Sequence, residues 1–344
     1  MQKYQQNNSD DEIKLKEKKK IKRMPVWKLV ITDILLTVIS LCIFAMFHHV
    51  LPQSSNDEQK TVATVEDNEK NEFALPGSYE SSNNDEANNT DNTTNNDTRS
   101  ISKRGDTKVD SNRGNTNTSD FSSDKTDIDN IDSQNKTTTE VNNYKSENIN
   151  LTVNKVEIGE GSDKITYYVS DIYVKNVNYL KTAFATGTYG KNYRENILDM
   201  AEENDAVLAV SGDFYGNSEE GVVIRNGVLY RSVVNDADIC VLFTEGTMKT
   251  YSPEEFDADE VILKGAWQAW TFGPELLDGS GNVLASFNTT SYLNKDNPRC
   301  ALGYIEEGHY VFVVVDGRDE GYSKGATLSE LAQIMADEGC MTAY

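Results

Sequence analysis

Apolar residues are distributed unevenly along this chain and divide it into three parts. Residues 29–47 are apolar except for Asp33 and three hydroxyl residues. With the apolar residues on either side, they give about 20 to 25 residues, enough to cross a hydrocarbon core of roughly 30 Å as a helix. A long polar stretch follows, and short alternating apolar runs return near residue 149. The pattern therefore predicts a membrane helix, a polar linker and a folded domain.

The charge on either side of the apolar segment predicts its orientation. Residues 1–28 contain nine Lys or Arg against four Asp or Glu, and no small-residue cleavage site follows the segment. Basic residues favour the cytoplasmic side, and the missing cleavage site favours an uncleaved anchor over a signal peptide. We expect a basic cytoplasmic tail at residues 1–25, a transmembrane helix at 26–51 in contact with the lipid bilayer, and an extracellular C-terminal part.

The polar stretch has too few apolar residues to form a core. Residues 77–140 are almost entirely Asn, Asp, Ser, Thr, Gly and Lys. Such a composition cannot bury enough apolar surface to offset the chain entropy lost on folding. We therefore expect residues 52–148 to be a disordered extracellular linker. The apolar residues of residues 77–140 are Tyr79, Ala87, Ile101, Val109, Phe121, Ile128 and Ile131.

The pattern from residue 149 onward predicts an α+β domain. Asn226-Gly227 between two apolar runs is a strong hairpin signal, because both residues accept positive φ. Thr327 and Glu330 have the spacing of a helix capping box. The fold expected for 149–344 is a hairpin-rich mixed sheet with a few packing helices. Expected strands are residues 150–156, 165–174, 206–210, 221–225, 228–231, 239–243, 247–251, 266–272, 299–305, 309–315 and 340–344, and expected helices are 194–203 and 327–338.

The stretch 206–231 carries the first candidate chemistry. Residues 206–210 are an apolar run typical of a buried strand, and the run ends at Asp213 between a glycine and two aromatic residues. The hairpin that follows places Arg225 and Arg231 near the same sheet end. A carboxylate with arginines close by suggests an anionic, polar ligand, although a solvated turn with surface arginines has the same pattern.

Composition excludes several classes of function. The formal net charge is −23, which disfavours binding to a phosphate backbone, so we expect no nucleic-acid partner. His309 is the only histidine away from the membrane segment, which excludes a multi-histidine zinc site. The three cysteines outside the membrane segment do not form a disulfide framework. No cofactor and no metal are expected.

Polar clusters end three of the apolar strands: Gly-Asp-Phe-Tyr-Gly at 212–216, Asn-Pro-Arg at 297–299, and Val-Asp-Gly-Arg at 315–318. Together with Val-Ile-Arg-Asn-Gly at 223–227, Phe-Gly-Pro at 272–274 and a Leu-x-Glu-Leu-Ala helix at 328–332, their order resembles the phosphodiester glycosidase family. That family includes the catalytic domain of N-acetylglucosamine-1-phosphodiester alpha-N-acetylglucosaminidase and membrane-anchored bacterial exopolysaccharide biosynthesis proteins. The resemblance covers roughly residues 165–344.

The resemblance implies hydrolysis of a sugar-1-phosphodiester at its glycosidic bond, with a sugar-phosphodiester or cell-envelope glycan as the partner. By motif, the implied catalytic residues are Asp213, Asp316 and Tyr215. Arginine grips phosphate with a fixed fork of donors, so the expected phosphate-binding residues are Arg299, Arg318 and Arg225. We expect the two aspartates, Arg299 and Arg318 to line one pocket.

One departure from the family pattern concerns the C-terminal end of the chain. Family members continue after the equivalent of Thr-Ala-Tyr with an acidic, glycine-rich loop, and Tyr344 ends this sequence. The expectation is therefore a domain truncated at its C-terminus and nearly inactive.

Two other functions remain open at this stage. A metal-dependent phosphodiesterase would hold Mg²⁺ or Ca²⁺ between Asp213 and Asp316 and would leave a sugar phosphate. A non-catalytic envelope domain would use the same arginines and aromatic residues to bind glycan. The products formed from a sugar-1-phosphodiester distinguish all three functions.

Overall fold

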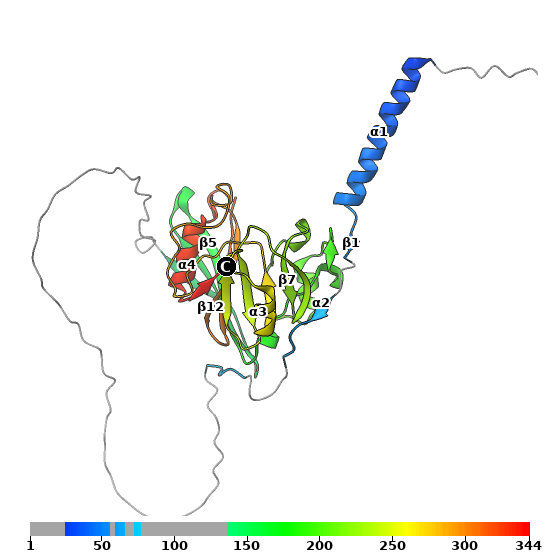
Figure 1. Ribbon diagram of the computed structural model, residues 1–344. Helices are drawn as coiled ribbons and strands as arrows, with labels where there is room; N and C mark the ends of the chain where they lie inside the picture. The colour runs from blue at the N-terminus through cyan, green and yellow to red at the C-terminus, as the bar shows by residue number, and fades with distance from the viewer. Residues whose placement is uncertain (1–24, 56–58, 66–71, 77–135) are drawn as a thin grey trace, which may run out of the picture. The chain divides into compact units, whose positions relative to one another are not determined.

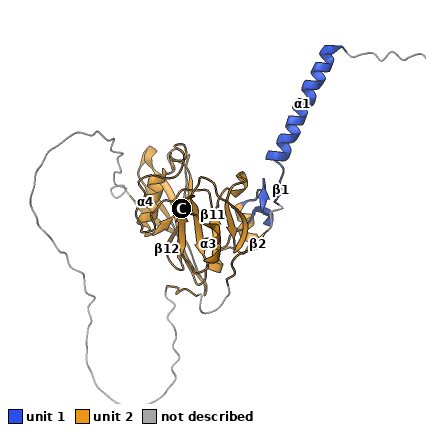
Figure 2. Ribbon diagram, in the orientation of Figure 1, with its two compact units in different colours: residues 1–56, 184–196 blue, residues 57–183, 197–344 orange. Residues whose placement is uncertain are grey.

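The computed structural model describes residues 25–55, 59–65, 72–76 and 136–344. The chain forms two compact units (Figures 1 and 2). The first unit consists of residues 1–56 and 184–196, and the second of residues 57–183 and 197–344.

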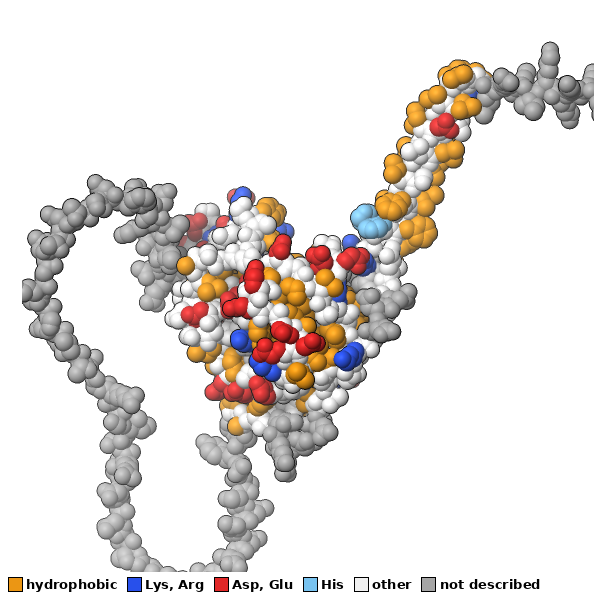
Figure 3. All heavy atoms as spheres, viewed as in Figure 1, with side chains coloured by type: hydrophobic (Ala, Val, Ile, Leu, Met, Phe, Trp, Pro, Cys, Tyr) orange, Lys and Arg blue, Asp and Glu red, His pale blue; other side chains and the backbone are white. Residues whose placement is uncertain are grey.

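The first unit contains the predicted membrane helix. Helix α1 spans Val26–His49, has no buried residue, and is long and apolar enough to cross a membrane. Hydrophobic side chains cover it in the view of Figure 3. A two-residue antiparallel ladder joins β1 (Gln53–Ser54) to β6 (Gly190–Lys191) within the same unit. The expectation of one long apolar helix near the N-terminus is confirmed, and its orientation stays a prediction.

The second unit contains two six-stranded antiparallel sheets. We call the first the β7 sheet, with strand order β10-β9-β11-β7-β8-β2. Its β7–β8 hairpin turns through Asn226 and Gly227, with φ of 51° and 73°, as the sequence predicted. The strands are β2 (Lys60–Thr61), β7 (Gly221–Arg225), β8 (Val228–Val233), β9 (Ile239–Phe243), β10 (Met248–Tyr251) and β11 (Ala266–Trp270).

The other sheet, called the β13 sheet, has strand order β14-β12-β13-β5-β4-β3. Its hairpin of β12 and β13 matches the predicted strands at 299–305 and 309–315. The strands are β3 (Thr137–Lys145), β4 (Ile149–Ile158), β5 (Ile165–Val174), β12 (Arg299–Glu306), β13 (His309–Val315) and β14 (Thr342–Ala343).

Three hydrophobic clusters form where the two sheets pack on each other and on helices. The first packs α4 (Leu328–Asp337) on one face of the β13 sheet. The second lies between the two sheets and the third packs α3 (Ala258–Leu263) on the outer face of the β7 sheet. The predicted capping box of Thr327 and Glu330 starts α4. The second unit is therefore a helix–sheet–sheet–helix stack, and the α+β class is confirmed.

Short 3₁₀ helices η3 to η6 lie at Gly161–Asp163, Val177–Tyr179, Ala185–Gly187 and Tyr215–Asn217.

The predicted buried strand at residues 206–210 was wrong. These residues form no strand, and Val207 is 45% exposed. None of the backbone hydrogen bonds in the described chain involves residues 207–212. An apolar run becomes a strand only when a neighbouring strand pairs with it, and neither sheet offers one here. Helix α2 (Ile197–Glu203), which precedes this run, has no buried residue: Ile197 is exposed, and Met200 and Ala201 are half-buried.

Parts of the segment expected to be a disordered linker belong to the fold. Strand β2 pairs with β8, and β3 pairs with β4 along its whole length. Leu75 is 9% exposed, and Phe73 packs against the cluster between the sheets. Strand β3 is exposed at all nine residues, so backbone hydrogen bonds hold it without any buried apolar side chain. At these segments the structure differs from the prediction, while residues 77–135 lie outside the described residues.

Candidate functional site

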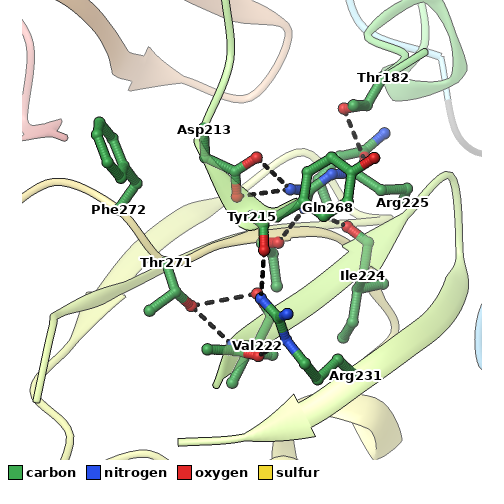
Figure 4. A network of polar contacts seen from close by, with 12 residues as sticks. Thr182, Asp213, Tyr215, Val222, Ile224, Arg225, Arg231, Gln268, Thr271 and Phe272 are labelled. Atoms are coloured by element: carbon green, nitrogen blue, oxygen red, sulfur yellow. Dashed lines mark hydrogen bonds and ion pairs between the residues drawn. The ribbon is translucent and has the colours of Figure 1, made fainter. Parts of the chain in front are cut away.

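The most buried ion pair in the described chain joins Asp213 to Arg225 (Figure 4). Asp213 lies just before η6, and Arg225 is the last residue of β7. The Nη2 atom of Arg225 lies 2.6 Å from each carboxylate oxygen of Asp213. The side chains are only 1% and 7% exposed, so the two charges offset each other away from solvent. A hydrogen bond between ionised groups is stronger than a neutral one, and the pair fixes the carboxylate in one orientation.

The remaining donors of Arg225 all point into the protein. Nη1 donates to the backbone carbonyl of Ile224 at 2.9 Å and to that of Ala269. Nε is buried without an acceptor, and the Trp270 ring lies 5.9 Å from the guanidinium carbon. Both terminal nitrogens of this buried guanidinium thus bind groups of the protein itself and hold Asp213 in place. The phosphate-binding role expected for Arg225 stays a prediction.

Arg231 holds the loop that follows Asp213. Its Nε donates to the carbonyl of Gly221 at 2.8 Å, and its two terminal nitrogens donate to Ser218 at 2.6 Å and Tyr215 at 3.1 Å. The two arginines of the β7–β8 hairpin thus both contact the stretch 213–221 (Figure 4). Arg231 contacts the backbone carbonyl of Tyr215, the third residue expected to be catalytic.

Arg299 anchors a second group of predicted residues at one end of the β13 sheet. Its Nε donates to the carbonyl of Ala326 at 2.9 Å, and Nη2 donates to the carbonyls of Leu293 and Lys295. Burial lowers the pKa of the Arg299 guanidinium, and the nearby charge of Arg318 acts in the same direction. Because backbone carbonyls use these donors, Arg299 fixes the loop 293–297.

Asp316 and Arg318 lie in a tight loop directly after β13. The hydroxyl of Tyr322 donates to the Asp316 carboxylate at 2.9 Å, and Nη2 of Arg318 donates to Oδ1 of Asn297 at 2.8 Å. Arg318 has a left-handed φ of 61°, a strained conformation that recurs at functional sites. A Cβ atom at Gly317 would lie 2.8 Å from the backbone nitrogen of Pro298, so no side chain fits there.

The two groups come from different sheets, and Arg299 alternates with Ala301, which packs in the cluster beneath α4. Arg225 extends from the surface of the β7 sheet that carries Trp270, toward the cluster between the sheets. On the β13 sheet, the side chains of Tyr310 and Phe312 contact the cluster between the sheets. Asp316 follows them at the same two-residue spacing. Among the described residues, no hydrogen bond or ion pair joins Asp213 or Arg225 to Arg299, Asp316 or Arg318. The single pocket expected for these residues therefore stays a prediction.

Sequence reasoning did not identify the polar network around Tyr344. The hydroxyl of Tyr344 accepts the backbone N–H of Phe272 at 2.6 Å and of Gly273 at 3.0 Å, and donates to the carbonyl of Asp238 at 2.9 Å. Burial raises the pKa of this phenol, so it stays a neutral donor. No sequence pattern links these residues, because they come together only when the two sheets pack.

Within the described part of the chain, no group of three or more His, Cys, Asp or Glu residues is arranged to hold a metal ion.

Comparisons with known proteins agree with the resemblance. Residues 204–344 match the family described as phosphodiester glycosidase, and this range contains all six predicted site residues. A relative in Bacillus subtilis (strain 168), the SPbeta prophage-derived uncharacterized protein YomE, is 31% identical over 229 residues. That match covers 61% of this chain and 35% of the relative, so the chain spans about a third of its length.

Two solved structures are also similar. The catalytic domain of zebrafish N-acetylglucosamine-1-phosphodiester alpha-N-acetylglucosaminidase, auto-inhibited by its pro-peptide, is 17% identical with a TM-score of 0.44. The alignment covers 61% of this chain and 74% of that chain. A hypothetical protein from Synechocystis is 12% identical with a TM-score of 0.42, covering 58% and 56% of the two chains. Over residues 204–344, the family match therefore agrees with the resemblance to phosphodiester glycosidases.

Proposed function

We propose that this domain hydrolyses the glycosidic bond of a sugar-1-phosphodiester, of the N-acetylglucosamine-phosphodiester kind, in cell-surface polysaccharide metabolism. The observation that carries the proposal is the carboxylate of Asp213, held by the buried guanidinium of Arg225 within the matched family domain. A carboxylate fixed in this way suits the positive charge that develops on the sugar ring as its glycosidic bond breaks.

The reaction needs little assistance at the leaving group. Water adds to the anomeric carbon, the bond between that carbon and the phosphate oxygen breaks, and the phosphate leaves as a monoester. Because a phosphate already leaves readily, stabilising the charge at the sugar matters more than protonating the leaving oxygen. We assign Asp213 to the anomeric carbon, as nucleophile, base or electrostatic stabiliser. Asp316, with its Tyr322 hydrogen bond, is the second carboxylate of the proposed site.

Arg318 is the residue we assign to the phosphate. Its side chain is exposed, and Asn297 is its one hydrogen-bond partner in the described chain, so most of its donors face solvent. The N–H groups of Arg225 and Arg299 that make hydrogen bonds donate to groups of the protein itself. Arg225 therefore acts as a positioning residue in this proposal, and Arg299 supports the loop that carries Asn297.

Product analysis tests the proposed reaction. The protein is incubated with an N-acetylglucosamine-1-phosphodiester in ¹⁸O-labelled water, and the products are weighed by mass spectrometry. We expect free sugar labelled at the anomeric hydroxyl and an unlabelled phosphomonoester. Label in a phosphate together with sugar-1-phosphate would instead indicate cleavage of the P–O bond, the metal-dependent alternative, which a chelator would abolish. Binding without any product would indicate a glycan-binding domain.

Variants connect the reaction to the site. Asp213→Asn is expected to lower kcat with a smaller effect on KM, and Arg318→Ala to raise KM. Asp236→Asn, which changes an exposed carboxylate, is the matched control and should behave as the wild type. A melting curve for each variant separates lost chemistry from lost folding. Wild-type kcat in Asp213→Asn would exclude this carboxylate from the reaction.

A further inference from the structure

Two exposed aromatic side chains meet beside Asp213. Phe214 follows Asp213 directly, and Phe272 follows Thr271 beyond the end of β11 (Figure 4). Phe214 is 60% exposed and Phe272 is 56% exposed. Their ring centroids lie 5.9 Å apart with the planes at 65°, so the rings meet edge to face. Two phenylalanines from distant parts of the chain therefore form one apolar surface at the candidate site.

The backbones that carry these rings are held firmly. The N–H of Phe272 is bound by the Tyr344 hydroxyl at 2.6 Å, and the Thr271 hydroxyl makes hydrogen bonds to both backbone groups of Val222, at 2.9 Å and 3.1 Å. Phe214 lies between Asp213, held by Arg225, and η6, whose Asn217 N–H donates to the Phe214 carbonyl at 3.1 Å. The rings are thus presented to solvent by a fixed scaffold.

The electrostatic surroundings select among ligands. The charges of Asp213 and Arg225 offset each other beside the rings, so a phosphate finds no net positive charge there. The face of an aromatic ring carries partial negative charge and attracts polarised C–H groups. An edge-to-face pair leaves one ring face open for such contacts. A neutral ring with C–H groups on one face, such as a pyranose, fits these conditions.

We propose that Phe214 and Phe272 form an aromatic platform that binds the sugar ring of the substrate. This inference rests on the proposed function, because it places the sugar beside Asp213 and the phosphate elsewhere, toward Arg318. The platform sets specificity for the sugar side of the substrate, and it binds sugar whether or not hydrolysis follows.

Ligand-observed NMR with two probes tests the platform. Free N-acetylglucosamine represents the sugar, and glycerol 3-phosphate represents the phosphate side. We expect Phe214→Ala and Phe272→Ala each to weaken sugar binding about three- to tenfold, since aromatic contacts of this kind contribute that much. Binding of glycerol 3-phosphate should not change. Phe272→Tyr should keep sugar binding, and Phe272→Leu, which keeps apolar surface but removes the ring, should lose it.

A control and a kinetic readout complete the experiment. Leu263→Ala removes an 88% exposed apolar side chain on α3 and should change nothing. With the sugar-1-phosphodiester, the aromatic variants should raise KM and leave kcat near wild type. Unchanged sugar binding in the Phe214→Ala/Phe272→Ala double variant would overturn the platform, as would equal weakening of both probes. Sugar binding that depends on both rings without any hydrolysis would support the platform and contradict the proposed function.

Discussion

One nitrogen of Arg225 lies 2.6 Å from both carboxylate oxygens of Asp213, and both side chains are almost fully buried. A buried charge pair is costly to break, because removal of one partner leaves the other charge without compensation. The pair therefore joins the stability of the β7 sheet to the orientation of the proposed catalytic carboxylate.

Arg225→Met is expected to destabilise the fold by about 3–5 kcal/mol, because it leaves Asp213 buried without its partner. Asp213→Asn should also destabilise, because Arg225 then loses its charge partner. The double variant should recover part of the sum of the two losses, a coupling that a double-mutant cycle in urea measures. Strictly additive losses would show that the pair is not coupled, and that Arg225 has another role.

Tyr344→Phe tests the network that holds the Phe272 backbone. Loss of one hydroxyl leaves the N–H groups of Phe272 and Gly273 and the carbonyl of Asp238 without that partner. We expect a loss of about 1–3 kcal/mol in the free energy of unfolding, measured by thermal and chemical denaturation. Tyr322→Phe, which removes another tyrosine hydroxyl far less buried, is the comparison variant. An unchanged melting temperature for Tyr344→Phe would mean that the network adds little to stability.

Phe73 packs beneath two turns of the sheets. A Cβ atom added at Gly308 would lie 2.5 Å from the Phe73 Cβ, and one added at Gly246 would lie 2.5 Å from its ring. We expect Phe73→Ala to cost about 1–3 kcal/mol, since it removes a half-buried aromatic side chain. Gly308→Ala should cost more, because Gly308 also has a φ of 83°. Denaturation curves measure both.

The neighbouring Glu72→Ala is the matched control for Phe73→Ala, since Glu72 makes only a partly exposed ion pair with Lys175. It should change stability by less than about 0.5 kcal/mol. If Phe73→Ala has no greater effect than this control, residues 72–76 do not contribute to the folded domain.

Features that depend on neighbours in the sequence were predicted well. The Asn226-Gly227 turn and the capping box of Thr327 and Glu330 are decided by a few adjacent residues, and the structure confirms both. Features that depend on distant partners were not. Residues 206–210 are as apolar as a buried strand, and only the missing ladder partner keeps them from becoming one. Phe73 is an isolated apolar residue in a polar stretch, and its packing depends on glycines more than 170 positions away.

The candidate site shows the same division between features set by neighbouring residues and features set by distant partners. The sequence identified Arg225, Arg299 and Asp316 as polar residues at strand ends, because residue type and strand boundary are local properties. Asp213 was identified in the same way, although the strand expected before it does not form. It could not assign the arginines' roles, because a guanidinium binds carbonyls, carboxylates and phosphates with the same donors. In the folded chain Arg225 binds the Asp213 carboxylate, and Arg299 binds backbone carbonyls. The role of Phe272 also emerges only from its exposure and its contact with Phe214.

Glu275 gives the domain a pH-dependent stability. Burial raises the pKa of this carboxyl above its ordinary value of 4.5, and the Asp238 charge adds to the shift. The folded state therefore binds the proton more tightly than the unfolded state. The contribution is most favourable below the unfolded pKa and is lost as pH rises through the folded pKa. Urea denaturation from about pH 4 to pH 8 should show this decline, and Glu275→Gln should reduce it. An unchanged slope in the variant would assign the decline to other groups.

The last prediction concerns membrane topology. Helix α1 is long and apolar enough to span a bilayer, and the basic residues precede it. We therefore expect residues 1–25 inside the cell and the second unit outside. Ser329→Cys adds a thiol at an exposed position of α4, and Ser9→Cys adds one to the basic tail. A membrane-impermeant maleimide applied to intact cells should label the first variant, and should label the second only after permeabilisation.

The unmodified chain measures background from its four cysteines, three of which lie outside α1. Labelling of Ser9→Cys in intact cells would show the opposite orientation. Loss of the tail from the mature protein, seen by mass spectrometry, would show instead that α1 is a signal sequence, since a cleaved helix cannot anchor the domain.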